Sequence, residues 1–242
     1  MKHIFLTLAL LIGTTLVAQV NQTDAQGRKQ GQWEKKYENS NQVRYRGEFH
    51  NDIPIGTFTY FHQSGARLSV IEYRGETGVG YATMYERGGW KMAEGIFVNE
   101  KRDSTWRYYG PDGDLVSTIN WKKGEKDGVE TILYHDGSIA ETITWAAGVK
   151  EGEWVQKFPD GSTRARGVYA NGRLHGDVMY YGQEGRPEYI GSYVNGLKDG
   201  NWYIFKGGRQ HIKEIYDMGT LLDSECLNSE GCPELEESET DE

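Results

Sequence analysis

Apolar and polar residues alternate over short stretches of this chain, and glycine interrupts the alternation at regular points. In residues 139–145, "IAETITW", the side chains of Ile139, Ile143 and Trp145 share one side of an extended backbone, while alanine and threonine share the other. No long stretch carries apolar residues at helical spacing without an interrupting glycine. The pattern therefore predicts many short β-strands joined by tight turns, and almost no helix.

One glycine position recurs every 24 or 25 residues, eight times along the chain. Two residues after it comes a Trp or Phe in five of the eight units, and five or six residues after it comes an aromatic residue in all eight. A further aromatic residue lies about seventeen positions after it, before an "NG" or "xG" turn. The position is occupied by Gly31, Gly56, Gly80, Ser104, Gly128, Gly152, Gly176 and Gly200.

Each unit therefore reads as one β-hairpin. An isolated hairpin is barely stable in water, so the units are expected to pair edge to edge and to cover one another's aromatic side chains. Two strands per unit at about 4.8 Å each predict a rod about 75–80 Å long. The fold expected is all-β: a single elongated, solenoid-like sheet of about eight stacked β-hairpins.

The aromatic rows have two interpretations. They pack each hairpin against the next, or they form an exposed stripe that contacts peptides or glycans. Three units lack the Trp-like aromatic residue, which leaves room for notches along one face: the residues there are Ala82, Glu130 and Val178.

Residues 193–202 read Y-x-N-G-x-x-x-G-x-W, and weaker copies of this string occur in every unit. The string resembles the MORN repeat in its bacterial 24-residue variant, over residues 26–219. Proteins with this variant often carry a YwqK-type toxin–antitoxin antitoxin label. Better-studied MORN proteins use the array for dimerisation, protein scaffolding or phospholipid contact. The resemblance implies a scaffold, and the fold alone does not specify its function.

The first eighteen residues are typical of a secretory signal peptide. Lys2 precedes an apolar run at residues 4–17, and Ala18 precedes the expected cleavage point at Gln19. The run is too short to span a bilayer. A buried N-terminal strand or helix is the alternative. We expect a protein exported to the bacterial periplasm or beyond, with a short linker at residues 19–25 and the repeat array at residues 26–219.

Residues 220–242 predict an acidic tail without regular structure. Residues 223–242 hold nine of the 36 acidic residues and no Lys or Arg, so residues 1–222 balance 27 acidic against 27 basic residues. A neutral body argues against nucleic acid and against stable membrane association. The tail holds both cysteines, Cys226 and Cys232, which predict a small disulfide; two free thiols or half of a metal site are the alternatives.

No catalytic, cofactor or metal motif is evident. The chain has no G-x-S-x-G and no P-loop, and the "PDGD" turn at residues 111–114 is far from a full calcium ligand set. No histidine pair has metal-ligand spacing, and none of the many carboxylates can be singled out. We therefore expect a non-enzymatic protein without cofactor or metal.

The function expected is that of an exported scaffold that binds another protein, as an elongated monomer, with a dimer as an alternative. Other candidates are an antitoxin-like or immunity-like inhibitor, a glycan-binding or lipid-binding module, and a hydrolase. One predicted sheet face mixes Arg and Tyr with small polar residues, a composition enriched at protein interfaces; an ordinary solvated face is the alternative. The candidate partner-binding residues on it are Arg107, Tyr109, Arg164 and Arg166.

Overall fold

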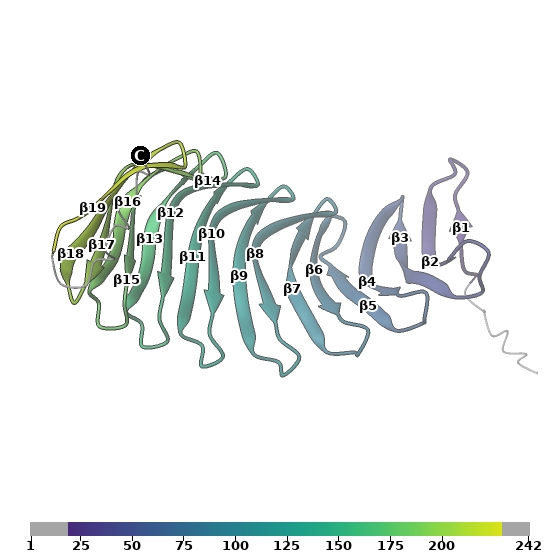
Figure 1. Cartoon of the computed structure of the whole chain (residues 1–242). Helices are drawn as coiled ribbons and strands as arrows, with labels where there is room; N and C mark the ends of the chain where they lie inside the picture. Colours follow the sequence, from purple (N-terminus) through teal and green to yellow (C-terminus); the bar gives the residue numbers. More distant parts are fainter. Residues whose placement is uncertain (1–18, 229–242) are drawn as a thin grey trace, which may run out of the picture.

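A computed structural model of the chain describes residues 19–228. Within that span the protein is a single open antiparallel sheet of 19 strands, and it contains no helix. Each long strand from β2 to β18 pairs with its neighbours along the chain on both sides (Figure 1). The predicted all-β array of stacked hairpins is therefore confirmed.

The eight predicted hairpins extend from β2 to β18, with the first strand of the seventh hairpin divided into β14 and β15. Two further strands, β1 and β19, flank them. The strands are β1 (Gln22–Thr23), β2 (Lys29–Lys36), β3 (Val43–His50), β4 (Ile53–Phe61), β5 (Arg67–Tyr73), β6 (Val79–Tyr85), β7 (Lys91–Val98), β8 (Lys101–Tyr109), β9 (Leu115–Lys122), β10 (Glu125–Leu133), β11 (Ile139–Ala146), β12 (Val149–Lys157), β13 (Thr163–Ala170), β14 (Arg173–Leu174), β15 (Gly176–Tyr181), β16 (Pro187–Val194), β17 (Leu197–Lys206), β18 (Arg209–Asp217) and β19 (Thr220–Cys226).

Both ends of the array extend further than the sequence predicted. The expected linker at residues 19–25 contains β1, which pairs with β2. The expected unstructured tail at residues 220–242 begins with β19, which pairs with β18 along its length. Its first residues form a strand because they repeat the start of the preceding unit: Leu221 and Asp223 stand 24 residues after Leu197 and Asp199. The predicted signal peptide, residues 1–18, and residues 229–242 lie outside the described residues.

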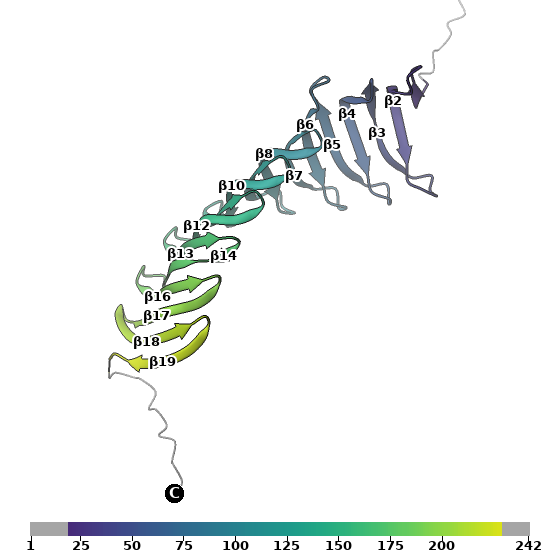
Figure 2. The ribbon, with the colours of Figure 1, turned by 90° about the horizontal axis from the view of Figure 1, so that it is seen from above.

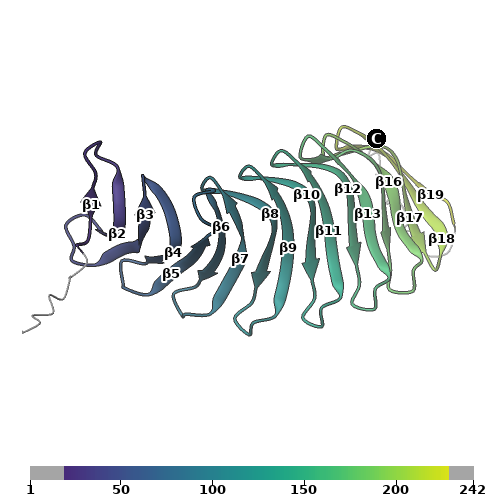
Figure 3. The ribbon, with the colours of Figure 1, turned by 180° about the vertical axis from the view of Figure 1, so that it is seen from behind.

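The array is curved and twisted, in contrast to the straight rod that strand spacing alone implies. Figure 2 shows the hairpins turning progressively along the array, and Figure 3 shows the same curvature from behind. Strand twist contributes to this turn, and so does a bulge near the start of most first strands. In β10 the register with β9 shifts between Lys126 and Glu130, around Gly128 at φ +105°. Ser104 adopts the same left-handed conformation, at φ +61°.

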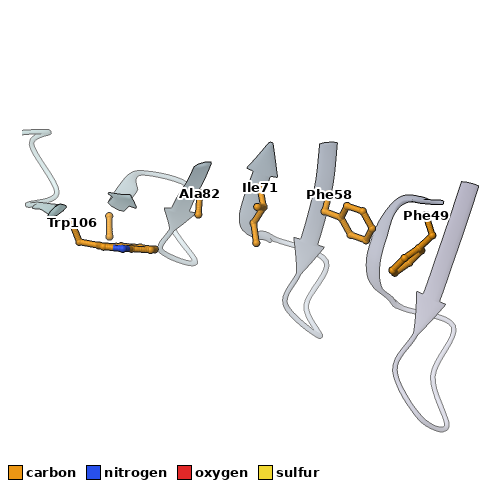
Figure 4. Packing of buried hydrophobic residues seen from close by; sticks show 6 residues of the cluster. Phe49, Phe58, Ile71, Ala82 and Trp106 are labelled. Atoms are coloured by element: carbon orange, nitrogen blue, oxygen red, sulfur yellow. The ribbon is translucent and has the colours of Figure 1, made fainter. Parts of the chain in front are cut away.

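The core lies on a single face of the sheet, which we call the aromatic face, and one row of side chains forms most of it, with Phe49, Ala93 and Ala165 buried beside the row. Figure 4 shows part of the row, running from strand to strand along the array. Trp106 is 0% exposed and Phe58 is 1% exposed. The interpretation of the Trp-like positions as packing residues is therefore confirmed, and the exposed-stripe interpretation is wrong for them. The buried apolar members of the row are Phe58, Ile71, Ala82, Trp106, Ile119, Ile143, Trp154, Val178 and Trp202.

The notches expected at units without the aromatic residue are absent. Ala82 is fully buried and Glu130 is 9% exposed. At two of the three units the missing ring volume is supplied by isoleucine on a neighbouring strand, since Ala82 pairs with Ile71 and Glu130 pairs with Ile119. At the third, Val178 is buried against Gly167. Where that neighbouring position is glycine instead, a large ring usually covers it: Phe58 lies on Gly47, Trp106 on Gly95 and Trp202 on Gly191.

Candidate functional site

The four predicted partner-binding residues lie on the face opposite the core, which we call the second face. On β8, Trp106 points to the aromatic face, so its neighbour Arg107 points away from it; on β13, Ala165 is buried while Arg164 and Arg166 are exposed. The two pairs come from strands that are five positions apart in the sheet, about 24 Å. The structure therefore divides the predicted residues into two groups instead of joining them in one site.

The first group is centred on Glu94 of β7. The Tyr109 hydroxyl donates a hydrogen bond to the Glu94 carboxylate, and Lys91 Nζ lies 3.1 Å from Glu94 Oε2. Burial alone would raise the pKa of Glu94, but hydrogen bonds from Tyr109, Lys91 and Tyr81 outweigh it and hold that pKa below its ordinary value. Burial, together with the bond to Glu94, raises the pKa of the Tyr109 phenol. Tyr109 therefore has an internal partner, which sequence reasoning did not anticipate.

The two arginines of the second group, Arg164 and Arg166, make contacts with different parts of the structure. Arg164 lies beside the hairpin tip, with its guanidinium 5.9 Å from the Phe158 ring centroid. Arg166 extends along the sheet, where its Nη2 lies 3.1 Å from the sulfur of Met179. Among the described residues, neither arginine forms an ion pair with a carboxylate.

Arg166 lines a hollow of about 390 Å³ on the second face, across β12, β13 and β15. Its floor is apolar and its edges are charged. Val168 is 44% exposed there, and the Asp177 carboxylate is held by the Ser192 hydroxyl at 2.6 Å. The side chains of the second face that line it are Glu153, Val155, Arg166, Val168, Asp177 and Met179.

A periodic row of basic side chains lies over the aromatic face, and sequence reasoning missed it. The Arg102 guanidinium is 4.9 Å from the Trp106 ring centroid and 5.0 Å from that of Trp121. Such cation–π contacts stabilise the ring packing by about 0.5–1 kcal/mol each. The available signal was a basic residue two positions before the repeat glycine position. It occurs as Lys29, Arg102, Lys126, Lys150 and Lys198.

The acidic residue immediately before the repeat glycine position also has a structural role. Glu151 Oε2 accepts a hydrogen bond of 2.8 Å from the backbone N–H of Asn171, which begins the turn of the next unit. Asp199 accepts one from the N–H of Met218 at 3.2 Å. Asn171 and Met218 both have positive φ, as a two-residue hairpin turn requires. Each residue of the recurring "K-D-G" therefore has its own role. The lysine lies over the aromatic rings, the aspartate accepts a hydrogen bond from a backbone N–H of the next turn, and the glycine occupies the bulge.

Two of the described histidines, His50 and His135, form isolated surface contacts, whereas His211 is buried. His50 Nδ1 lies 2.6 Å from Glu76 Oε1, and His135 Nδ1 lies 3.0 Å from Asp114 Oδ2. In residues 19–228, no cluster of three or more His, Cys, Asp or Glu side chains is arranged to hold a metal ion. The same span contains no helix long and apolar enough to cross a membrane.

Of the two cysteines, only Cys226 lies in the described part of the chain. It ends β19 and is not a free thiol. Cys232 lies outside the described residues, so the disulfide between the two stays a prediction.

No protein-family model and no curated protein matches the chain. Its similarity to solved structures is weak. With TarM, known from S. aureus, it shares 10% identity over 58% of this chain and 20% of TarM, at a TM-score of 0.27. With the TcdB2–TccC3 structure it shares 14% identity over 83% of this chain and 12% of that one, at a TM-score of 0.17. The chain spans about a fifth of the length of TarM, and likenesses at this level carry no argument about function.

Proposed function

We propose that this protein is an exported, non-catalytic repeat scaffold of the MORN type that binds another protein through its second face. Support comes from the different roles of the two faces of the sheet. The aromatic face is occupied by the packing of the array itself, whereas the second face keeps exposed apolar and charged side chains that this packing does not need. A protein that stacks hairpins in this way presents a long, pre-ordered surface, so little conformational freedom is lost when a partner binds.

The hollow around Arg166 is the observation that carries the proposal. Protein interfaces combine a small apolar centre with arginine and a polar rim. Here Val155, Val168 and Met179 form the apolar part, and Arg166 crosses it without a carboxylate partner among the described residues. A matching partner surface would insert an apolar side chain beside Val168 and place a carboxylate against Arg166.

The proposal is tested by site-specific cross-linking in the native organism. A photo-reactive amino acid in place of Val168 should give one dominant cross-linked partner, whereas the same substitution at Tyr203, outside the hollow, should not. Arg166→Glu should reduce the yield of that cross-link by about tenfold or more, since it reverses the charge at the centre of the contact.

Arg164→Glu is the matched control, because it makes the same charge change on the same strand and face but lies outside the hollow. It should leave the yield within about twofold of the unaltered protein. Equal losses with both variants would show a general charge effect and would contradict a site at the hollow. A partner found equally at position 203 would contradict it as well.

A further inference from the structure

The described part of the array ends in the middle of a repeat. β19 is the first strand of a ninth unit, since Leu221, Asp223 and Ser224 stand 24 residues after Leu197, Asp199 and Gly200. In each complete unit a second strand returns antiparallel to the first. Among residues 19–228, no strand pairs with the far edge of β19. The sheet therefore stops at a strand whose hairpin partner is absent from the described chain.

Within residues 19–228, no strand covers the outer edge of this last strand. All seven of its residues are exposed, with Leu221 at 50% and Leu222 at 62%. Natural sheets usually cover or shorten such an edge, because its free backbone groups pair readily with other chains. The opposite end of the array is protected in this way: β1 pairs with β2, and Asn21 N–H donates to the Gln32 carbonyl at 2.9 Å.

The backbone of β19 is oriented for strand addition. The N–H of Leu227 donates to the His211 carbonyl on β18 at 2.9 Å. Successive N–H groups alternate in direction along a strand, so the N–H of Ser224 points away from β18. It donates instead to the carboxylate of its neighbour Asp223, at 2.9 Å. An added strand would replace this local bond.

A second copy of the chain does not fit this edge well. If two β19 strands paired antiparallel about their centre, Asp223 would face its own copy, and like charges in direct opposition destabilise a sheet. The other end of a second copy offers only the two-residue β1. Both modes of self-association are therefore disfavoured.

We propose that an extended segment of another protein adds to the outer edge of β19 at residues 220–225, in the position that a second strand takes in the other hairpins. The side chains of β19 specify its chemistry. Leu221 pairs with Tyr216 and lies on the aromatic face, while Asp223 and Glu225 pair with Ile215 and Lys213 on the second face. The segment that fits alternates apolar residues with lysine or arginine, so that its basic side chains lie beside the two carboxylates. Strand addition of this kind derives its affinity from main-chain hydrogen bonds and its specificity from alternate side chains.

The experiment uses the full chain and a synthetic peptide of alternating lysine and valine, long enough to cover residues 220–225. Peptide binding should slow hydrogen exchange at the Ser224 amide at least tenfold. Ser224→Pro removes that N–H from the free edge without removing one that bonds to β18, so it should weaken binding at least tenfold, whereas Ser224→Ala should not. The double variant Asp223→Lys, Glu225→Lys should lose the lysine peptide and bind a glutamate–valine peptide instead.

Each opposite result overturns the proposal. Unchanged binding by Ser224→Pro would mean that the peptide is held by charge alone. Slow hydrogen exchange at the Ser224 amide in the free protein would mean that the edge is already occupied. If deletion of residues 229–242 then speeds the exchange, those residues occupy the edge; if dilution speeds it, a second copy of the chain does. Arg166→Glu should leave peptide binding unchanged, because the hollow lies on other strands. The peptide experiment therefore tests the site on β19 independently of the proposed function.

Discussion

The indole ring of Trp106 lies against the backbone of Gly95 so closely that a Cβ atom on Gly95 would overlap the ring. Gly95 belongs to β7 and Trp106 to β8, the second strand of one hairpin and the first strand of the next. The ring is therefore covered partly by the glycine backbone, and this contact joins two repeats. The same arrangement recurs with Phe58 on Gly47 and Trp202 on Gly191.

Gly95→Ala should destabilise the protein by about 1–3 kcal/mol, because the added methyl group must displace a fully buried ring. Gly88→Ala is the control, since a Cβ there would be at least 3.5 Å from its nearest neighbour, in ordinary contact, and its φ is not positive. Urea unfolding of both variants measures the difference. Trp106→Ala alone should cost about 3–5 kcal/mol.

The double variant Gly95→Ala, Trp106→Ala should be more stable than the sum of the two single effects predicts, since removal of the ring makes room for the methyl group. Strict additivity would show that the two residues do not share volume.

Ser104→Gly should stabilise the protein by about 1 kcal/mol, because Ser104 adopts a left-handed conformation that glycine adopts without strain. Gly200→Ser makes the reverse change at the equivalent position, where φ is +69° and a Cβ would have open space around it. It should destabilise the protein by a similar amount. Denaturation midpoints of the two variants should move in opposite directions; a shift of both in the same direction would exclude backbone strain as the cause.

The contact between Tyr109 and Glu94 predicts a pH-dependent contribution to stability. The folded-state pKa of Glu94 is lowered from its ordinary value of 4.5, so the folded state favours the ionised carboxylate. Its stabilising effect is complete above pH 4.5 and is lost as the pH falls through the folded-state pKa. Glu94→Gln should therefore be less stable than the unaltered protein at pH 7, and the gap should narrow below pH 4.5.

Urea unfolding at several pH values tests this expectation, with Tyr109→Phe as the companion variant. Loss of the phenol donor removes part of the cause of the pKa shift, so Glu94→Gln should have a smaller effect in the Tyr109→Phe background. A gap that stays constant down to pH 3 would show that the ionisation of Glu94 does not contribute.

The sequence also predicts removal of residues 1–18. Intact-mass measurement of the protein recovered from the cell envelope or the medium should give a chain that begins at Gln19, because Ala18 follows an apolar run of signal-peptide length. A protein that keeps Met1 and remains in the cytoplasm would contradict export.

Features that depend on local chemistry were accessible from the sequence alone. The hairpin period follows from the spacing of turn residues, since "NG" pairs such as Asn171–Gly172 adopt the two positive φ angles that a tight hairpin turn requires. Strand alternation then assigns Trp154 and Arg166 to opposite faces, because side-chain direction in a strand has a period of two. The strand character of Thr220–Cys226 was also present in the 24-residue correspondence, although the acidic composition obscured it.

Contacts between units were decided by the tertiary structure. Cross-strand neighbours such as Gly95 and Trp106, or Tyr109 and Glu94, are more than ten residues apart in sequence, and the register that brings them together depends on bulges. An added residue at a bulge changes which side chains oppose one another. The repeat period therefore does not determine which ring covers which glycine. It also does not determine the distance between Arg107 and Arg166. In the core row, a small residue on one strand is compensated by a larger side chain on a neighbouring strand. Which residues compensate each other depends on the strand pairing in the folded sheet.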